Sequence, residues 1–321
     1  ARPQTLLTLP GGRIAYWLSP AMTRAFTMGK SLGEVAEPKV GLQTGDNARF
    51  LRQWFEVSQS RTCFDADSRE AAVTSGAKWF PHLKGGAFRK WWGNQDYVIN
   101  WENDGAELWN FLPRSVIRNP DYYFKPAISW SNVSSGEPSF RFYELLTGFS
   151  NSTTCRSLLA VLSPTLHFEA GQLAGLPIVD TRTSRPDSIF VRRLIHLFRS
   201  DWNAYETSWG FEGSPLVQYA RSKGSLVDAL EHWWLNSLSA AREAQKLETE
   251  NNRYWSEVYG LQNEVPIEVP LSRVSLTSNP YFRYAPSKGT ARTDEEYRRL
   301  FVGDAVRDLI SYGVGCLFGR Y

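Results

Sequence analysis

The side chains best suited to chemistry gather in one basic and aromatic segment, from Lys78 to Gln95. This segment carries Lys78, Lys84, Arg89 and Lys90 and no acidic residue, and its large aromatic residues are Trp79, Phe80, Phe88, Trp91 and Trp92. Such cations bind phosphate oxygens, and the glycines after Lys84 allow the backbone to approach a ligand closely. The pattern indicates a nucleic-acid contact. The alternative is a solvated loop whose tryptophans belong to the core.

Two further polar segments have side chains that can reach the edges of bases. Residues 41–52 place Gln43, Thr44, Asn47, Arg49 and Arg52 around two glycines, and residues 129–141 contain Ser129, Asn132, Ser134, Ser135 and Arg141. Amide and guanidinium groups recognise bases through paired hydrogen bonds. The alternatives are a plain turn for the first segment, since Gly-Asp-Asn is ordinary turn chemistry, and a solvated hairpin for the second.

Signatures of catalysis and of cofactor binding are incomplete. The four histidines come without a Gly-x-Ser-x-Gly motif or metal-ligand spacing. Asn119-Pro120-Asp121-Tyr122 and Asn279-Pro280-Tyr281-Phe282 each lack the second proline of the Asn-Pro-Pro-aromatic motif of adenine-N6 methyltransferases, and the glycines of 313–319 close a helix rather than open one. We therefore predict no catalytic residue, no cofactor site and no metal site in this chain.

Composition sets the broad class. The net charge is only +3, so any nucleic-acid footprint must be a local cluster. Three scattered cysteines without a Cys-x-x-Cys pair fit a reduced, cytoplasmic location, and no apolar run approaches the ~20 residues needed to cross a membrane. Because the chain begins with Ala1 rather than Met, we expect a piece of a longer polypeptide.

Hydrophobic patterning predicts an α+β fold in two parts. Short apolar runs between Gly, Pro, Asn and Asp predict a strand-rich domain over residues 1–180, with one helix at 153–162 and a loop with a short strand over 164–180. Apolar residues three and four apart predict a mainly helical domain over 181–321, with the boundary at 181–187. Its expected helices begin near Asp187, run from Ser225 to Tyr259, open at the capping box of Thr293, and cover 306–318.

Several phrases, in order along the chain, resemble the PglX family, the adenine-specific DNA methyltransferases of BREX phage-defence systems. They include Gly41-Leu42-Gln43-Thr44-Gly45-Asp46-Asn47, Lys84-Gly85-Gly86, Ile128-Ser129-Trp130, Asp201-Trp202-Asn203-Ala204-Tyr205 and Tyr259-Gly260-Leu261-Gln262. The resemblance spans essentially the whole chain. Between Arg141 and the helix near residue 155 the sequence is shorter than the family pattern.

This resemblance implies a DNA target-recognition domain at 1–180 and a helical carboxy-terminal domain at 181–321. Catalysis and S-adenosylmethionine would belong to an amino-terminal methyltransferase domain of the same polypeptide, so that this piece is inactive alone and holds no cofactor. Implied partners are double-stranded DNA, other BREX proteins and a phage-encoded inhibitor. The residues expected to contact DNA are Gln43, Thr44, Asn47, Arg49, Arg52, Lys78, Lys84, Arg89, Lys90, Asn94, Ser129, Asn132, Ser134, Ser135 and Arg141.

Two other functions stay open on the residues. The helices and aromatic side chains could form a protein-interaction module that docks other defence proteins or a phage inhibitor without reading DNA. The 13 tryptophans could form a carbohydrate-binding platform, although the cations interleaved with them count against sugar stacking. Salt separates these alternatives, since DNA binding fades as the salt concentration rises.

Overall fold

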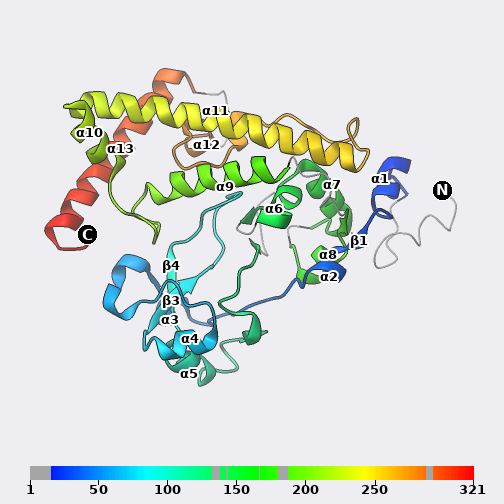
Figure 1. Cartoon of the computed structure of the whole chain (residues 1–321), viewed down its shortest axis with the longest axis horizontal. Coiled ribbons are helices and arrows are strands. Elements are labelled where there is room, and N and C mark those ends of the chain that lie inside the picture. Colours follow the sequence, from blue (N-terminus) through cyan, green and yellow to red (C-terminus); the bar gives the residue numbers. More distant parts are fainter. Residues whose placement is uncertain (1–15, 132–137, 142–143, 166, 180–186, 287–291) are drawn as a thin grey trace.

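The computed structural model describes residues 16–131, 138–141, 144–165, 167–179, 187–286 and 292–321. It is a mixed fold with small sheets and a mainly helical carboxy-terminal half (Figure 1). The elements before residue 180 are short: α1 (Pro20–Ala25), β1 (Lys30–Ser31), α2 (Leu32–Val35), α3 (Asn47–Phe50), β2 (Leu51–Gln53), α4 (Arg69–Thr74), β3 (Trp79–His82), β4 (Tyr97–Asn100), α5 (Glu102–Trp109), β5 (Ser129–Trp130), β6 (Phe140–Arg141), α6 (Glu144–Ser150), α7 (Thr153–Leu162), α8 (Ala170–Ala174) and β7 (Pro177–Ile178).

A three-stranded antiparallel sheet, in the order β2-β4-β3, organises the lower lobe of Figure 1. The central strand pairs Ile99 with Leu51 on one side and with Phe80 on the other. These three apolar side chains are buried together with Phe50 and Leu108 from α3 and α5. Two-stranded pairs, β1 with β7 and β5 with β6, complete the strands of the described residues.

The helical half consists of α9 (Asp187–Asn203), α10 (Pro215–Lys223), α11 (Leu226–Val258), α12 (Pro280–Arg283) and α13 (Asp294–Leu317). The long helix α11 lies along the top of the molecule with α9 beside it (Figure 1). The side chain of Ser225 caps the first turn of α11, and Gly260, at φ +66°, follows its last turn, in agreement with the sequence. The capping box of Thr293 and Glu296 opens α13 as predicted.

Two predictions about elements were wrong. Residues 306–318 do not form a separate helix, because α13 continues from Asp294 through Gly303 to Leu317, with Phe301 and Ala305 buried on either side of that glycine. The segment 164–180 is not only loop and strand, since it contains α8, which buries Leu173. The helix predicted at 153–162 is confirmed.

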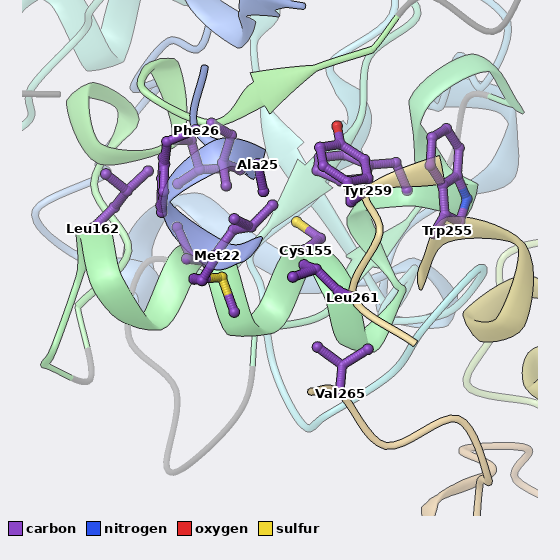
Figure 2. Packing of buried hydrophobic residues seen from close by; sticks show 14 of the residues in the cluster. Met22, Ala25, Phe26, Cys155, Leu162, Trp255, Tyr259, Leu261 and Val265 are labelled. Atoms are coloured by element: carbon purple, nitrogen blue, oxygen red, sulfur yellow. The ribbon is translucent and has the colours of Figure 1, made fainter. Parts of the chain in front are cut away.

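Two of the buried clusters combine both halves of the sequence. The largest cluster packs Met22 of α1 and Cys155 of α7 against Trp255 and Tyr259 from the end of α11 (Figure 2). A second cluster places Trp91, which is fully buried, among apolar residues of α9 and α11. The domain boundary predicted at 181–187 lies almost entirely outside the described residues and stays a prediction. Two buried clusters of the described residues draw on both parts, whereas a third lies entirely before residue 180 and a fourth entirely after it.

Candidate nucleic-acid interface

The Lys84-Gly85-Gly86 turn is an exposed tip formed by the segment that follows β3. Lys84 is exposed, and its Nζ atom lies 4.6 Å from the ring centroid of Tyr97. Gly85 and Gly86 adopt φ values of +85° and +153°, a backbone region that favours glycine. A β-carbon on Gly85 would lie 3.4 Å from Ser131 Oγ, so the tip sits beside Ser131, which belongs to the predicted 129–141 segment. The structure thus brings two of the predicted segments together.

The base of the same segment is anchored inside the protein. Lys90 Nζ lies 2.5 Å from Glu248 Oε2, and Trp91 Nε1 donates to Glu248 Oε1 at 2.7 Å. The Lys90 backbone N–H donates to Ser275 Oγ at 2.9 Å, and Arg89 Nη1 donates to the Ser275 carbonyl at 2.6 Å. These contacts join the segment to α11 and to the loop before α12. They engage Arg89 and Lys90, two of the four cations predicted to bind phosphate.

Arg141 and Asn94 are also interior residues. Arg141 is 1% exposed, and burial lowers the pKa of its guanidinium to about 10. Its Nη1 atom donates to Ser139 Oγ at 3.3 Å, while the Asn94 side chain donates to the Ala87 carbonyl at 3.0 Å. Both residues hold the β6 and 84–94 backbones in place and present no group to a DNA surface in this conformation.

Residues 41–52 form a capped turn on the lower lobe. The Asp46 side chain accepts from the Arg49 backbone at 3.0 Å and begins α3, and Thr44, which is buried, donates to Asn47 Oδ1 at 2.7 Å. Gly45 has φ +69°, and a β-carbon there would lie 2.2 Å from the Arg114 carbonyl oxygen. Only glycine permits this close approach.

The turn presents some of its predicted residues to solvent. Gln43 and Asn47 are exposed, and the Arg49 side chain is 50% exposed while lying 3.6 Å from Glu107. Arg52 is partly buried, and its Nη1 donates to the Ala48 and Leu51 carbonyls at 2.6 and 2.7 Å. Gln43, Asn47 and Arg49 are therefore the predicted residues that this turn offers to a ligand.

The remaining predicted residues fall into three groups. Lys78 Nζ lies 3.4 Å from Glu102 Oε2, so its charge is paired. Ser129 is partly buried, and among the described residues its hydroxyl oxygen has no hydrogen-bond partner. Asn132, Ser134 and Ser135 lie outside the described residues.

Sequence reasoning missed two exposed arginines next to the 41–52 turn, Arg114 and Arg118. Backbone hydrogen bonds in both directions between Gln43 and Val116, at 2.8 and 2.9 Å, place these arginines beside the turn. The signal was available, because residues 110–120 contain both arginines and no acid. It was overlooked because this run is less aromatic than 78–95.

The near-matches to methyltransferase motifs have structural roles. Asn279 is fully buried and caps α12, with its amide donating to the Leu271 and Val274 carbonyls at 2.8 Å. Asn119 donates to the Val40 carbonyl at 2.8 Å and precedes a 3-10 turn. Gly313 and Gly315 lie within α13 rather than in a loop before a helix. None of these positions fits the binding of S-adenosylmethionine or of a substrate amino group.

Neither a metal-binding cluster nor a membrane-spanning helix is found among the described ranges. Among the described residues, no group of three or more His, Cys, Asp and Glu side chains is placed to bind a metal ion. No helix within those ranges combines the length and the hydropathy needed to span a bilayer.

Comparison with known proteins supplies the family context. No family model matches the sequence. The adenine-specific methyltransferase PglX of Lacticaseibacillus casei (strain Zhang) is 29% identical over 344 residues, and the adenine-specific methyltransferase BrxX of Escherichia coli O9:H4 (strain HS) is 30% identical over 338 residues. Each alignment covers 98% of this chain but only 27% and 26% of the relative. The chain is therefore homologous, over nearly its whole length, to about a quarter of these PglX and BrxX methyltransferases.

Proposed function

We propose that this chain is the DNA target-recognition and carboxy-terminal part of a site-specific adenine methyltransferase that acts in phage defence. The observation that carries the proposal is the homology over 98% of the chain to two adenine-specific methyltransferases. Because the chain spans only about a quarter of those relatives, methyl transfer and S-adenosylmethionine binding are assigned to the rest of the polypeptide. Other phage-defence proteins and a phage inhibitor remain proposed partners of the whole enzyme.

Two surface elements are proposed to contact DNA. The Lys84 tip supplies a cation beside Ser131, and the Gln43–Arg49 turn supplies amide groups flanked by Arg114 and Arg118. Cations bind phosphates and set the register, whereas amides discriminate bases, each paired contact contributing roughly 1 to 3 kcal/mol. Arg89, Lys90, Asn94 and Arg141 are proposed to position these elements rather than to touch DNA.

The test is DNA binding by the purified chain, measured by fluorescence anisotropy with mixed-sequence duplexes at several salt concentrations. Affinity should fall steeply as salt rises, because bound counterions are released. Lys84→Glu should weaken binding to all sequences. It should also reduce the slope of log affinity against log salt concentration by about one, since one fewer counterion is released. Lys246→Glu, an exposed lysine on α11, is the matched control and should bind like the parent. A chain that does not bind duplex DNA even at low salt would refute the proposal.

Base recognition requires the whole methyltransferase. Changing Gln43 or Asn47 to Ala in the full-length enzyme should alter or relax one position of the methylated site, as read by long-read methylation mapping. The comparison is Arg242→Ala on α11, an exposed position away from the proposed contacts. The proposal is contradicted if the α11 variant alters the methylated site while both turn variants leave it unchanged. Recognition would then lie in the helical half of the chain.

A further inference from the structure

A cavity of about 510 Å³ lies where the first half of the chain meets the helical half. Phe55, Arg89 and Asp96 line it from the first half, and Trp202 and Asp308 line it from α9 and α13. Its volume is in the range of sites that bind small molecules, and such sites occur preferentially where domains meet. The proposed DNA contacts do not use this cavity.

Two carboxylates in its wall have no partner. Within the described parts of the chain, Asp96 and Asp308 make neither a side-chain hydrogen bond nor an ion pair, and Asp96 Oδ1 is buried. Burial raises the pKa of Asp96 to about 6 and also raises the pKa of Asp308. Glu206, in the same wall, differs because Arg320 lies 3.7 Å away and Tyr321 donates to it.

The arginines of the wall are engaged elsewhere. Arg89 donates to the Ser275 carbonyl, Arg283 pairs with Asp304 at 2.9 Å, and Arg320 pairs with Glu206. Arg89 lowers the pKa of Asp96 through space, but no hydrogen bond joins the two groups. The wall carries three arginines and three carboxylates, and Arg283 lowers the pKa of Asp308 through space as Arg89 does that of Asp96. Within the described residues, however, none of these arginines donates a hydrogen bond to Asp96 or Asp308, so both carboxylates keep oxygen atoms free to accept from a ligand.

The rest of the wall is aromatic and also incompletely satisfied. Its rings belong to Phe55, Trp202, Tyr205, Phe211, Trp233 and Tyr312. Trp202 is 6% exposed. Neither its indole N–H nor the Thr277 hydroxyl has a hydrogen-bond partner in the part of the chain that the structure describes. Aromatic faces attract cations and organic groups, and buried polar atoms without partners are rare in finished protein interiors. The Trp202 and Thr277 groups, which line the cavity, are therefore able to bond a polar group of a bound molecule.

We propose that this cavity binds a small organic cation, an amine or guanidine with an apolar body. Its charged group is held by the carboxylates of Asp308 and Asp96, and its body packs on the aromatic wall. A metal ion is a poorer fit, since two monodentate carboxylates among rings supply too few oxygen ligands. The proposal does not depend on DNA recognition, and its test contains no DNA.

The test is calorimetric titration and thermal unfolding of the purified chain with spermidine and with agmatine, against sodium chloride at equal ionic strength. Adenosine serves as an uncharged aromatic probe. The parent should bind at least one of the cations saturably and show a Tm that rises with its concentration. Asp308→Asn should weaken that binding about ten- to a hundredfold, the loss expected for a charged hydrogen bond.

Asp308→Asn also separates a binding role from a structural one. Because a buried carboxylate without a partner destabilises the fold, the variant should keep or raise the Tm of the free protein. Asp96→Asn tests the opposite side of the cavity should the first variant fail to fold, and Glu257→Gln, an exposed acid on α11, is the control. Three results would overturn the proposal: no saturable cation binding, binding unchanged in both Asp variants, or binding of adenosine alone.

Discussion

The buried ion pair between Lys90 and Glu248 is expected to hold the 84–94 segment to α11. The Glu248 side chain is 1% exposed and the Lys90 side chain 13% exposed. Removing one partner of a buried pair typically costs about 3 to 5 kcal/mol, because the other charge stays buried. The loss in free energy of unfolding for Lys90→Met should lie near 5 kcal/mol, because the Glu248 carboxylate would keep only its hydrogen bond from the Trp91 N–H. The loss for Glu248→Gln should lie near 3 kcal/mol, because the partly exposed Lys90 ammonium group can still reach water.

The double variant Lys90→Met/Glu248→Gln distinguishes this explanation from a simple loss of packing. With both charges gone, the free energy of unfolding should return to within about 2 kcal/mol of the parent, since neutral groups in place of a buried pair are often tolerated. The two single effects would then be non-additive by several kcal/mol, well beyond the ~0.5 kcal/mol expected for independent sites.

The assay is urea unfolding at pH 7, followed by tryptophan fluorescence. The control is the exposed pair of Arg193 and Glu243, whose side chains are 48% and 40% exposed and 2.6 Å apart. Glu243→Gln should cost less than about 1 kcal/mol. Additive single effects, or a cost for Glu248→Gln no larger than that for Glu243→Gln, would refute the anchoring role of the buried pair.

Three further predictions concern backbone geometry, pH and helix capping. Gly45→Ala should destabilise the protein by at least about 2 kcal/mol more than Gly76→Ala. Both glycines have positive φ, but of the two only Gly45 lies against backbone atoms. Equal urea midpoints for the two variants would contradict this. Burial and the charge of Lys84 lower the pKa of His82 to about 4 from 6.5, so the unfolded state binds the proton first and the free energy of unfolding should drop as pH falls from 6.5 toward 4. His82→Gln should flatten that part of the profile of urea midpoints against pH. Thr293→Ala should cost about 1 kcal/mol in urea unfolding by removing the cap of α13, and an unchanged midpoint would show that the cap contributes nothing.

Local patterns predicted the helices better than the site. The stripe from Leu226 to Val258 and the capping box at Thr293 are signals contained within a few turns, and both helices begin where the sequence indicates. Arg89 and Lys90 belong to a charge pattern that indicates a surface, yet Lys90 meets a carboxylate 158 residues away in the sequence. No local pattern contains that partner.

The strands were harder to predict for a similar reason. The runs around Leu51 and Phe140 contribute strands of three and two residues, after which the chain turns into a 3-10 segment or a helix. Their apolar character predicted strands, and both Leu51 and Phe140 are buried strand residues. It did not indicate how few residues would find a pairing partner, because strand length depends on neighbours from elsewhere in the chain.

The two clusters shared between the halves limit how the proposed target specificity could be exchanged. A first half moved between homologues would bring Trp91 and Lys90 without the surfaces of α9 and α11 that receive them, and would leave Trp255 facing a foreign α7. Recombination within the family should therefore succeed at surface turns such as 41–49, and fail at a cut near residue 180 unless the matching helices travel with it. Diversity in target sequence would then accumulate by point changes on turns rather than by the transfer of a whole module.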